Sequence, residues 1–425
     1  MKAILKFIKK TYKDVLQSIA FYPVLISLCL FTLALIGLNI ENLEIVKNIK
    51  KNIPYLFIQD YETARSILST LIGGILSLTV FSFTMVMVVL NQASSDFSPR
   101  LLPGLISNKR HQIILGIYIG TLLYCIIMLI SLGAYGVESN SLGLSTMFGA
   151  VLGVLCVGLF VYFIHSISKA IQIHNIIDRI FKRCSEFLDR QLKWQREETT
   201  ALKKINSEEW TVIESETTGY FREFDISLMN HYLKNTNNQI EVLPYPNQHI
   251  WKGDPVLKLK VPIPEEELPP LHFCLDISSD RHEEDGGIGG MIKLMEIAVK
   301  AMSPGINDPG TAVDVIIKLG QLLNKMLQFP PLSSNKLEGG EVVVIKNSIS
   351  AKQLMVSIVQ PIRLYSKNDA MVLSILIQAL TFAKGGINVS DENKQVVLEE
   401  LEALKYDLEK NVGNPLDKAY VLKLF

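Results

Sequence analysis

Four long apolar segments dominate the first part of the chain. They run from Val24 to Ile40, Ile67 to Leu90, Ile113 to Tyr135 and Leu142 to Ile164, and none of them contains Asp, Glu, Lys or Arg. A helix that crosses the ~30 Å hydrocarbon core of a bilayer needs roughly 20 apolar residues. The pattern therefore predicts a four-helix transmembrane domain over residues 1–165, with the lipid bilayer as a partner.

The positive charges predict which ends of these spans face the cytoplasm. Lys and Arg precede the first span, occupy the loop between the second and third spans and follow the fourth, whereas the loop around residues 136–141 has neither. Cytoplasmic loops are enriched in Lys and Arg, so we expect both termini to be cytoplasmic. Three lysines at positions 47, 50 and 51, in the first outer loop, oppose this orientation.

The second span carries hydroxyl and glycine residues along one helical face. They are Ser66, Thr70, Gly73, Ser77 and Thr84. Small and polar residues at such spacing let helices approach closely in lipid, and a hydroxyl-lined face also suits a narrow pore. The stripe is therefore either a helix-packing seam, which we place first, or a pore lining.

Beyond the fourth span, the pattern changes to one that is typical of a soluble domain. Apolar positions recur at three and four residues over 166–205 and predict a stalk helix that continues the span to about Glu197. Short β-like runs punctuated by Pro and Gly fill 206–280, at 211–215, 240–243, 256–261 and 271–277. The pattern over residues 281–425 predicts a mainly helical segment. The predicted fold class is an α-helical integral membrane protein with four transmembrane helices and a C-terminal α+β cytoplasmic domain.

Two runs in the β-rich segment resemble the folded-over barrel of biotinyl and lipoyl carrier domains. They are Gly219-Tyr220-Phe221 with Asp225, and residues 253–257. The resemblance implies a small β-barrel-like part. The Met-Lys-Met turn that carries the cofactor in those domains is missing, so we expect no cofactor.

Composition and charge narrow the candidate chemistry. The 42 basic and 42 acidic residues balance, which gives no basic face for nucleic acid. The five cysteines are far apart and form no CxxC pair, so neither a zinc site nor a disulfide framework is expected. The polar run from Asp280 to Asp285 has the side chains of a cation site, but a solvated acidic loop is the simpler interpretation. We therefore predict no metal site and no catalytic residue.

A polar turn between two predicted helices is the sharpest motif in the chain. Ser303-Pro304-Gly305 ends the first helix, and Asp308-Pro309 suits the cap and first position of the second. Because helix N-termini attract anions, the candidate ligand residues of this turn are Ser303, Asn307, Asp308 and Thr311. A purely structural corner is the alternative that we favour, and the ligand is unknown.

The stretch from Val299 to Ala312, VKAMSPGINDPGTA, resembles the signature of a bacterial family of membrane proteins, domain of unknown function 2254. The segment from Asn91 to Arg110 is similar to the loop between the second and third spans in that family. The resemblance implies a bacterial inner-membrane protein of four spans without a known activity.

Three functions are compatible with these features. An oligomeric channel or gated conduit with a cytoplasmic regulatory domain is favoured by the second-span stripe and by the absence of charged residues inside the spans. It implies a homo-oligomer. A non-catalytic sensor or scaffold that binds a ligand or partner through the cytoplasmic domain is the close alternative. A membrane-bound enzyme is a weaker third, since no catalytic motif supports it.

Overall fold

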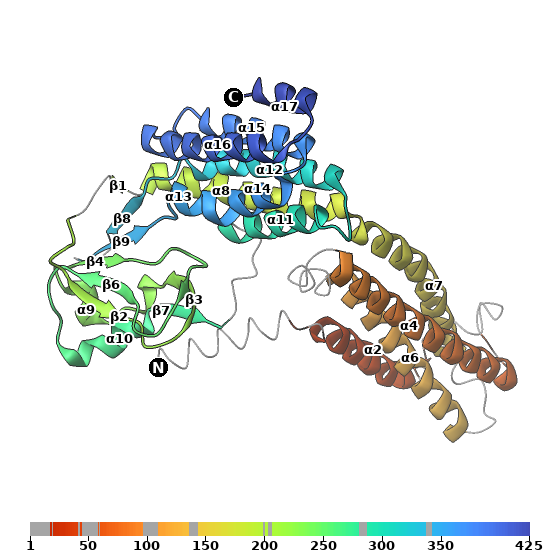
Figure 1. Cartoon of the computed structure of the whole chain (residues 1–425). Coiled ribbons are helices and arrows are strands. Elements are labelled where there is room, and N and C mark those ends of the chain that lie inside the picture. Colours follow the sequence, from red (N-terminus) through yellow and green to blue (C-terminus); the bar gives the residue numbers. More distant parts are fainter. Residues whose placement is uncertain are drawn as a thin grey trace. The chain divides into compact units, whose positions relative to one another are not determined.

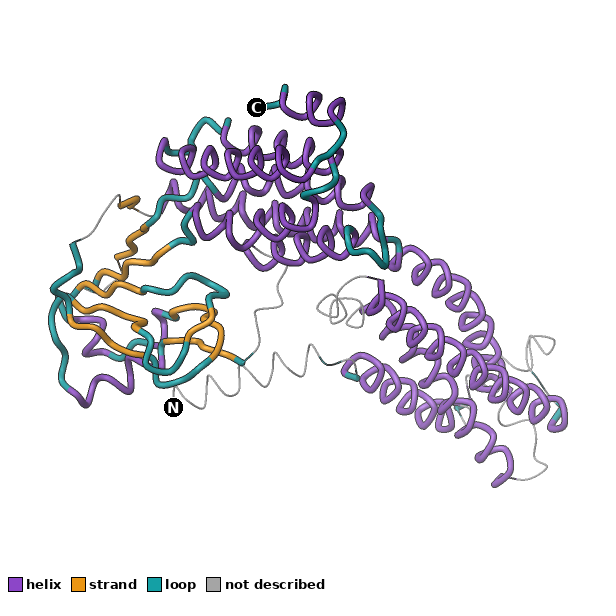
Figure 2. The backbone as a smooth tube through the Cα atoms, viewed as in Figure 1, coloured by secondary structure: helices purple, strands orange, loops and turns teal. Residues whose placement is uncertain are grey.

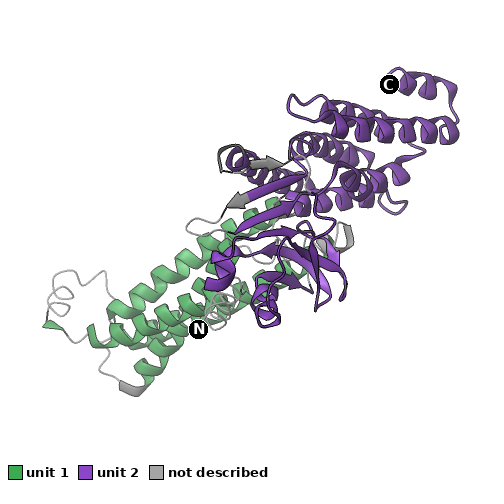
Figure 3. Cartoon of the chain, turned by 90° about the vertical axis from the view of Figure 1, so that its left-hand side faces the viewer, with its two compact units in different colours: residues 1–172 green, residues 173–425 purple. Residues whose placement is uncertain are grey.

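The structure is a computed structural model that describes residues 18, 20–40, 43–44, 58, 60–96, 109–135, 143–198, 200–202, 206–279, 287–336 and 342–425. The chain forms two compact units, residues 1–172 and residues 173–425 (Figure 3).

The first unit is a bundle of four long helices, as the hydrophobic pattern predicted. They are α2 (Phe21–Ile40), α4 (Tyr61–Asp96), α6 (Lys109–Tyr135) and α7 (Gly143–Ile171) (Figure 1). All four are long and apolar enough to cross a membrane. The 36 residues of α4 give a helix of about 54 Å, which exceeds the hydrocarbon core, so this span tilts or protrudes.

Glycines at a spacing of four hold this bundle together, with α6 in contact with each of the other three helices. A Cβ added at Gly116 would lie 3.0 Å from the backbone Cα of Pro23 in α2. One added at Gly153 in α7 would contact Leu71 Cδ2, at the end of a side chain of α4. These two glycines therefore serve packing within one subunit, because a larger residue would press on the backbone of α2 at position 116 and would displace the Leu71 side chain at position 153.

The second unit contains nine described strands in two sheets, drawn in orange in Figure 2. The strands are β1 (Thr200–Leu202), β2 (Thr211–Glu214), β3 (Gly219–Phe224), β4 (Gln239–Val242), β5 (His249–Ile250), β6 (Pro255–Leu259), β7 (Leu275–Ser278), β8 (Leu332–Lys336) and β9 (Val343–Asn347). The six-stranded sheet has the order β1-β8-β9-β4-β6-β2, and the three-stranded sheet has the order β5-β3-β7.

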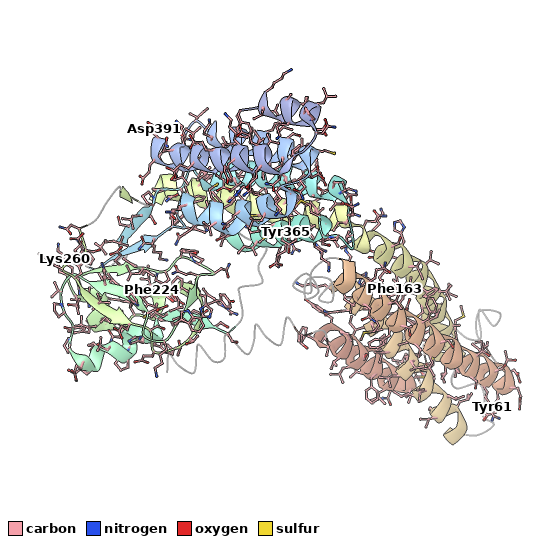
Figure 4. The ribbon with its side chains drawn as sticks, in the orientation of Figure 1. Tyr61, Phe163, Phe224, Lys260, Tyr365 and Asp391 are labelled. Carbon is pink, nitrogen blue, oxygen red and sulfur yellow. The ribbon has the colours of Figure 1, made fainter. Side chains whose placement is uncertain are left out.

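These sheets do not close, so the predicted β-barrel-like part is wrong. The strands β1 and β2 remain at opposite edges of the larger sheet. That sheet is completed by β9, which pairs in parallel with β4 and places Val344 opposite Ile240. The two open sheets share one hydrophobic core that includes Phe224, labelled in Figure 4. A parallel pair between residues 104 positions apart leaves no local signal, which is why the short runs suggested a self-contained barrel.

One predicted strand is also partly wrong. The run 271–277 begins as the last part of helix α10 (Leu268–Phe273), and only its end belongs to β7. Two prolines, Pro269 and Pro270, stand in the first turn of α10. Proline is favoured there because the first helical N–H groups have no partner within the helix.

Helices form the rest of the second unit. They are α8 (Ile173–Glu198), α9 (His231–Asn235), α11 (Gly287–Ala301), α12 (Pro309–Met326), α13 (Ala351–Leu354), α14 (Gln360–Ser366), α15 (Ala370–Lys384), α16 (Asp391–Asn411) and α17 (Pro415–Leu422). A π-helical turn at Met355–Val359 joins α13 to α14 and accommodates Pro361. The stalk helix is not continuous with the fourth span, since α7 ends at Ile171 and α8 begins at Ile173. Helix α8 packs on α11 and α12 of its own unit.

Candidate functional site

The five stripe residues of the second span all lie on the outside of the bundle. Ser66, Thr70, Gly73, Ser77 and Thr84 are exposed, and a Cβ added at Gly73 would meet nothing within 4 Å. The stripe is thus uncovered by the other helices of the subunit, in contrast to the packed glycines of α6 and α7. This face, with the residues added below, is called the outer seam of α4.

The outer seam follows a seven-residue repeat that extends beyond the predicted stripe. One repeat position is always polar and exposed, and the adjoining position is small or apolar and exposed. The first position holds Thr70, Ser77, Thr84 and Asn91, and the second holds Ser66, Gly73, Val80 and Met87. Alternating steps of four and three residues are the pattern by which parallel helices pack around a common axis.

The inward face of α4 has the opposite character. A third position of the same repeat holds Leu68, Ile75, Ser82 and Val89, and all four are buried. Leu68 packs in one apolar cluster, and Ile75 and Val89 pack in a second one together with Phe163 of α7, which is labelled in Figure 4 and is 2% exposed. This inward face of α4 therefore packs within the subunit, while the seam hydroxyls point outward beside large apolar residues such as Phe81 and Phe83.

The seam hydroxyls that donate to their own helix need no further acceptor. Thr70 Oγ1 donates to the Ser66 carbonyl at 2.8 Å, Ser77 Oγ to Gly73 at 2.9 Å and Thr84 Oγ1 to Val80 at 2.9 Å. Each hydroxyl oxygen keeps a lone pair that points away from the helix. Such groups tolerate lipid and also accept hydrogen bonds from a neighbouring helix, from water or from a hydrated cation. No charged residue lies between Arg65 and Asp96.

The turn before α12 satisfies its own polar groups. Asp308 caps the helix: its carboxylate accepts from Thr311 N at 3.1 Å and from Thr311 Oγ1 at 2.6 Å. These hydrogen bonds hold the pKa of Asp308 below its usual value. Asn307 takes the left-handed conformation, with φ of 48°, and Ser303 Oγ donates to the Lys300 carbonyl at 2.6 Å. The four turn residues thus have the arrangement of a structural corner, and their role as ligand residues stays a prediction.

The acidic run from Asp280 to Asp285 lies outside the described residues. Among the residues that the structure does describe, no three His, Cys, Asp or Glu side chains are close enough together to hold a metal ion.

An ion-pair network joins α8 and α12, and the sequence pattern did not predict it. Lys318 Nζ lies 2.8 Å from Asp314 and 3.2 Å from Asp178 of α8, and His174 Nδ1 lies 3.4 Å from Asp314. Burial lowers the pKa of Lys318, but its hydrogen bonds to the two aspartates outweigh this effect and raise the pKa above its usual value. The four-residue spacing of Asp314 and Lys318 indicates a pair on one helical face, whereas Asp178 becomes their neighbour only through the fold.

Comparison with known proteins agrees with the resemblance noted above. The family described as "Predicted membrane protein (DUF2254)" matches residues 17–381. An uncharacterized protein of Mycobacterium tuberculosis strain CDC 1551 is 24% identical over 370 residues, which cover 83% of this chain and 68% of the relative. A protein of Mycobacterium bovis, also uncharacterized, matches with the same identity and the same coverage. No solved structure matches the chain.

Proposed function

Because the chain belongs to the predicted membrane protein family DUF2254, we propose that it is the subunit of an oligomeric membrane conduit whose passage is lined by the outer seam of α4. The observation that carries the proposal is the exposure of this seam in a single subunit, at Thr70, Ser77, Thr84 and Asn91 among others. A four-span protein surrounded by lipid has no need to direct its most polar helical face outward. Copies assembled around that face give it a polar environment.

The repeat indicates the geometry of the assembly. Helices with a seven-residue seam cross at about +20° and place the seam along the common axis. Gly73 and the small hydroxyl residues permit close approach of the copies. The passage is lined by neutral oxygens, because the seam carries no charged residue. A conduit of this kind conducts passively, since coupled transport needs ionisable groups within the bilayer.

We further propose that the second unit lies on the cytoplasmic side of the bacterial inner membrane. Lys109 and Arg110 begin α6, and Lys169 lies in the last turn of α7. Positive residues at these helix ends support cytoplasmic termini. The second unit follows α7 after a single residue, Gln172. This short covalent connection supports a regulatory role for the second unit, in which α8 is held to α12 by the Lys318 network.

A matched pair of glycine variants tests the conduit. Gly73 on the seam and Gly158 on the exposed face of α7 both have nothing within 4 Å of an added Cβ, so leucine at either position leaves the single subunit intact. We expect Gly73→Leu to reduce ion flux in proteoliposomes to the level of protein-free liposomes and Gly158→Leu to conduct as the parent. Ser77→Leu should behave like Gly73→Leu.

Two results would refute the proposal that the outer seam lines the passage. One is equal flux from the two leucine variants in protein that is folded and assembled. The other is failure of a Ser77→Cys variant, prepared with Cys29→Ala, to crosslink between copies. Crosslinking without flux in the parent protein would instead favour the alternative of a non-catalytic sensor or scaffold.

A further inference from the structure

A basic and aromatic patch lies at the end of the bundle where α6 begins and α7 ends. Lys109 and Arg110 are the first two residues of α6, and both are exposed. Lys109 Nζ lies 5.9 Å from the centre of the Tyr22 ring in α2, and Arg110 Nη1 donates to Tyr162 Oη of α7 at 3.4 Å. Each cation is thus placed beside a tyrosine of a different neighbouring helix.

The next residue of α6 holds the patch in place. His111 Nε2 lies 3.0 Å from Ser166 Oγ of α7, and the imidazole ring packs edge-to-face on Phe163 with ring centres 5.4 Å apart. These two contacts attach the first turn of α6 to the last part of α7. Arg110 and Tyr162 are therefore kept together by the packing of the bundle, in addition to their own hydrogen bond.

Positive charge exceeds negative charge at this end of the bundle. Lys169, in the last turn of α7, is a third exposed cation, while α2, α6 and α7 contain no acidic residue along their whole length. Helix α4, whose Val89 packs with Phe163, ends with one acidic residue, Asp96. Among these four helices, the cations of this end therefore attract an anion.

The patch lies at the level of the bundle where lipid headgroups are found. The segment of α6 that can span a membrane begins at Lys109, and tyrosines are enriched at the boundary between headgroups and hydrocarbon. Ile113 follows Lys109 by four residues and Arg110 by three, so it lies below both on one helical face, and it is 38% exposed. A phospholipid has the same order of groups, with a phosphate above an acyl chain.

We propose that this patch binds an anionic phospholipid, with the headgroup phosphate on Lys109 and Arg110 and an acyl chain along Ile113. Ammonium and guanidinium groups donate strong, charge-assisted hydrogen bonds to phosphate oxygens, and a guanidinium can do so with two parallel N–H groups. Basic sites between transmembrane helices bind lipid headgroups in this way. A zwitterionic lipid binds less well, because the cations of the patch repel its ammonium group. The site is built within one subunit and does not rest on the proposed conduit.

Tryptophan quenching by brominated lipids tests the site. Full-length Ile113→Trp protein is placed in phosphatidylcholine nanodiscs that contain a minor fraction of either dibrominated phosphatidylglycerol or dibrominated phosphatidylcholine. Bromine quenches a tryptophan that it contacts, and the signal of the native tryptophans is subtracted with the protein that lacks the reporter. We expect phosphatidylglycerol to be preferred at least about fivefold, the effect of one Lys or Arg beside an anionic lipid.

The matched control is Ile130→Trp, because Ile130 lies on the same helix, towards its other end, and is 66% exposed. We expect no preference there. Equal quenching of the Ile113→Trp reporter by the two brominated lipids would overturn the proposal. An equal preference for phosphatidylglycerol at both reporters would also overturn it, since the attraction would then not be local.

A pair of charge variants assigns the binding to the patch. In the Ile113→Trp protein, Lys109→Gln together with Arg110→Gln should bring the preference to about one, whereas Arg65→Gln, near the start of α4, should leave it unchanged. A preference that survives the double substitution would overturn the assignment of these two residues. If the double variant fails to fold, the comparison of the two reporters in the otherwise unchanged protein still decides.

Discussion

Truncation of Arg363 should destabilise the C-terminal helices far more than a surface substitution does. The guanidinium of this α14 residue bridges two carboxylates of α16: Nε lies 2.8 Å from Glu400 Oε1, and Nη1 contacts Asp407. The three side chains are 15%, 14% and 18% exposed. Arg363→Ala would leave two buried carboxylates facing each other without a counter-charge.

Removal of one partner from a buried ion pair costs about 3–5 kcal/mol. Since the three side chains keep some exposure, we expect the lower end, about 3 kcal/mol, which corresponds to a roughly hundredfold change in the opening equilibrium. Hydrogen–deuterium exchange of the full-length protein in nanodiscs measures this directly, because amides of α16 exchange through local opening. We expect about hundredfold faster exchange around Leu401 and Leu404, which are buried on α16.

Two controls make this prediction refutable. Lys394→Ala removes an ion pair to Asp391 on the same helix. Because Asp391 is 99% exposed, we expect the exchange rate of α16 to change by at most a few-fold. A triple variant with Met at 363 and Leu at 400 and 407 removes all the buried charges and should recover most of the protection. If the exchange rate in Arg363→Ala rises only about twofold, as it would after a surface substitution, this prediction is refuted.

Three further predictions concern other parts of the chain. Gly116→Ala, whose new Cβ would lie 3.0 Å from Pro23 Cα, should lower the melting temperature in detergent, whereas Gly133→Ala, which meets nothing within 4 Å, should not. Asp308→Ala should destabilise α12 by about 1 kcal/mol at pH 7 in exchange measurements. Because the folded-state pKa of Asp308 is lowered, its contribution is present above its unfolded pKa and is lost as the pH falls below about 4, so variant and parent should converge in acid. Val80→Ser on the outer seam should raise ion flux in proteoliposomes, whereas Val154→Ser, on a lipid-facing position that is 74% exposed, should not.

The sequence predicted the parts of the fold that depend on local pattern. The four spans follow from the length and composition of apolar runs, and the cap at Asp308 follows from residue preferences within one turn. The pairing of β4 with β9 could not be predicted, because residues 104 positions apart, such as Ile240 and Val344, meet only in the folded state. The barrel-like part was therefore predicted from short strands without knowledge of their pairing partners, which lie far away in the sequence.

For the candidate site too, the sequence predicted the features that depend on local pattern and not those that depend on the fold. Helical period placed Ser66, Thr70 and Ser77 on one face, but the direction of that face depends on which side of α4 packs against α6 and α7. The same period extends the stripe to Asn91, which lies just beyond the predicted end of the apolar span at Leu90.

The composition of the outer seam bears on how a conduit built from it would be gated. Its polar levels at Ser77 and Thr84 are separated by Val80, which is 58% exposed in the subunit, about 4.5 Å and 6 Å away along the helix. A ring of valines between two rings of hydroxyls forms an apolar constriction, which excludes water while narrow and admits it after a small widening. Closure then needs no charged plug, which agrees with a seam that carries none. A rotation or tilt of α4 that withdraws Val80 from the axis would bring the flanking hydroxyls together. In the proposed conduit, Val80 would thus be the barrier in the closed state and the position at which a single hydroxyl should open it.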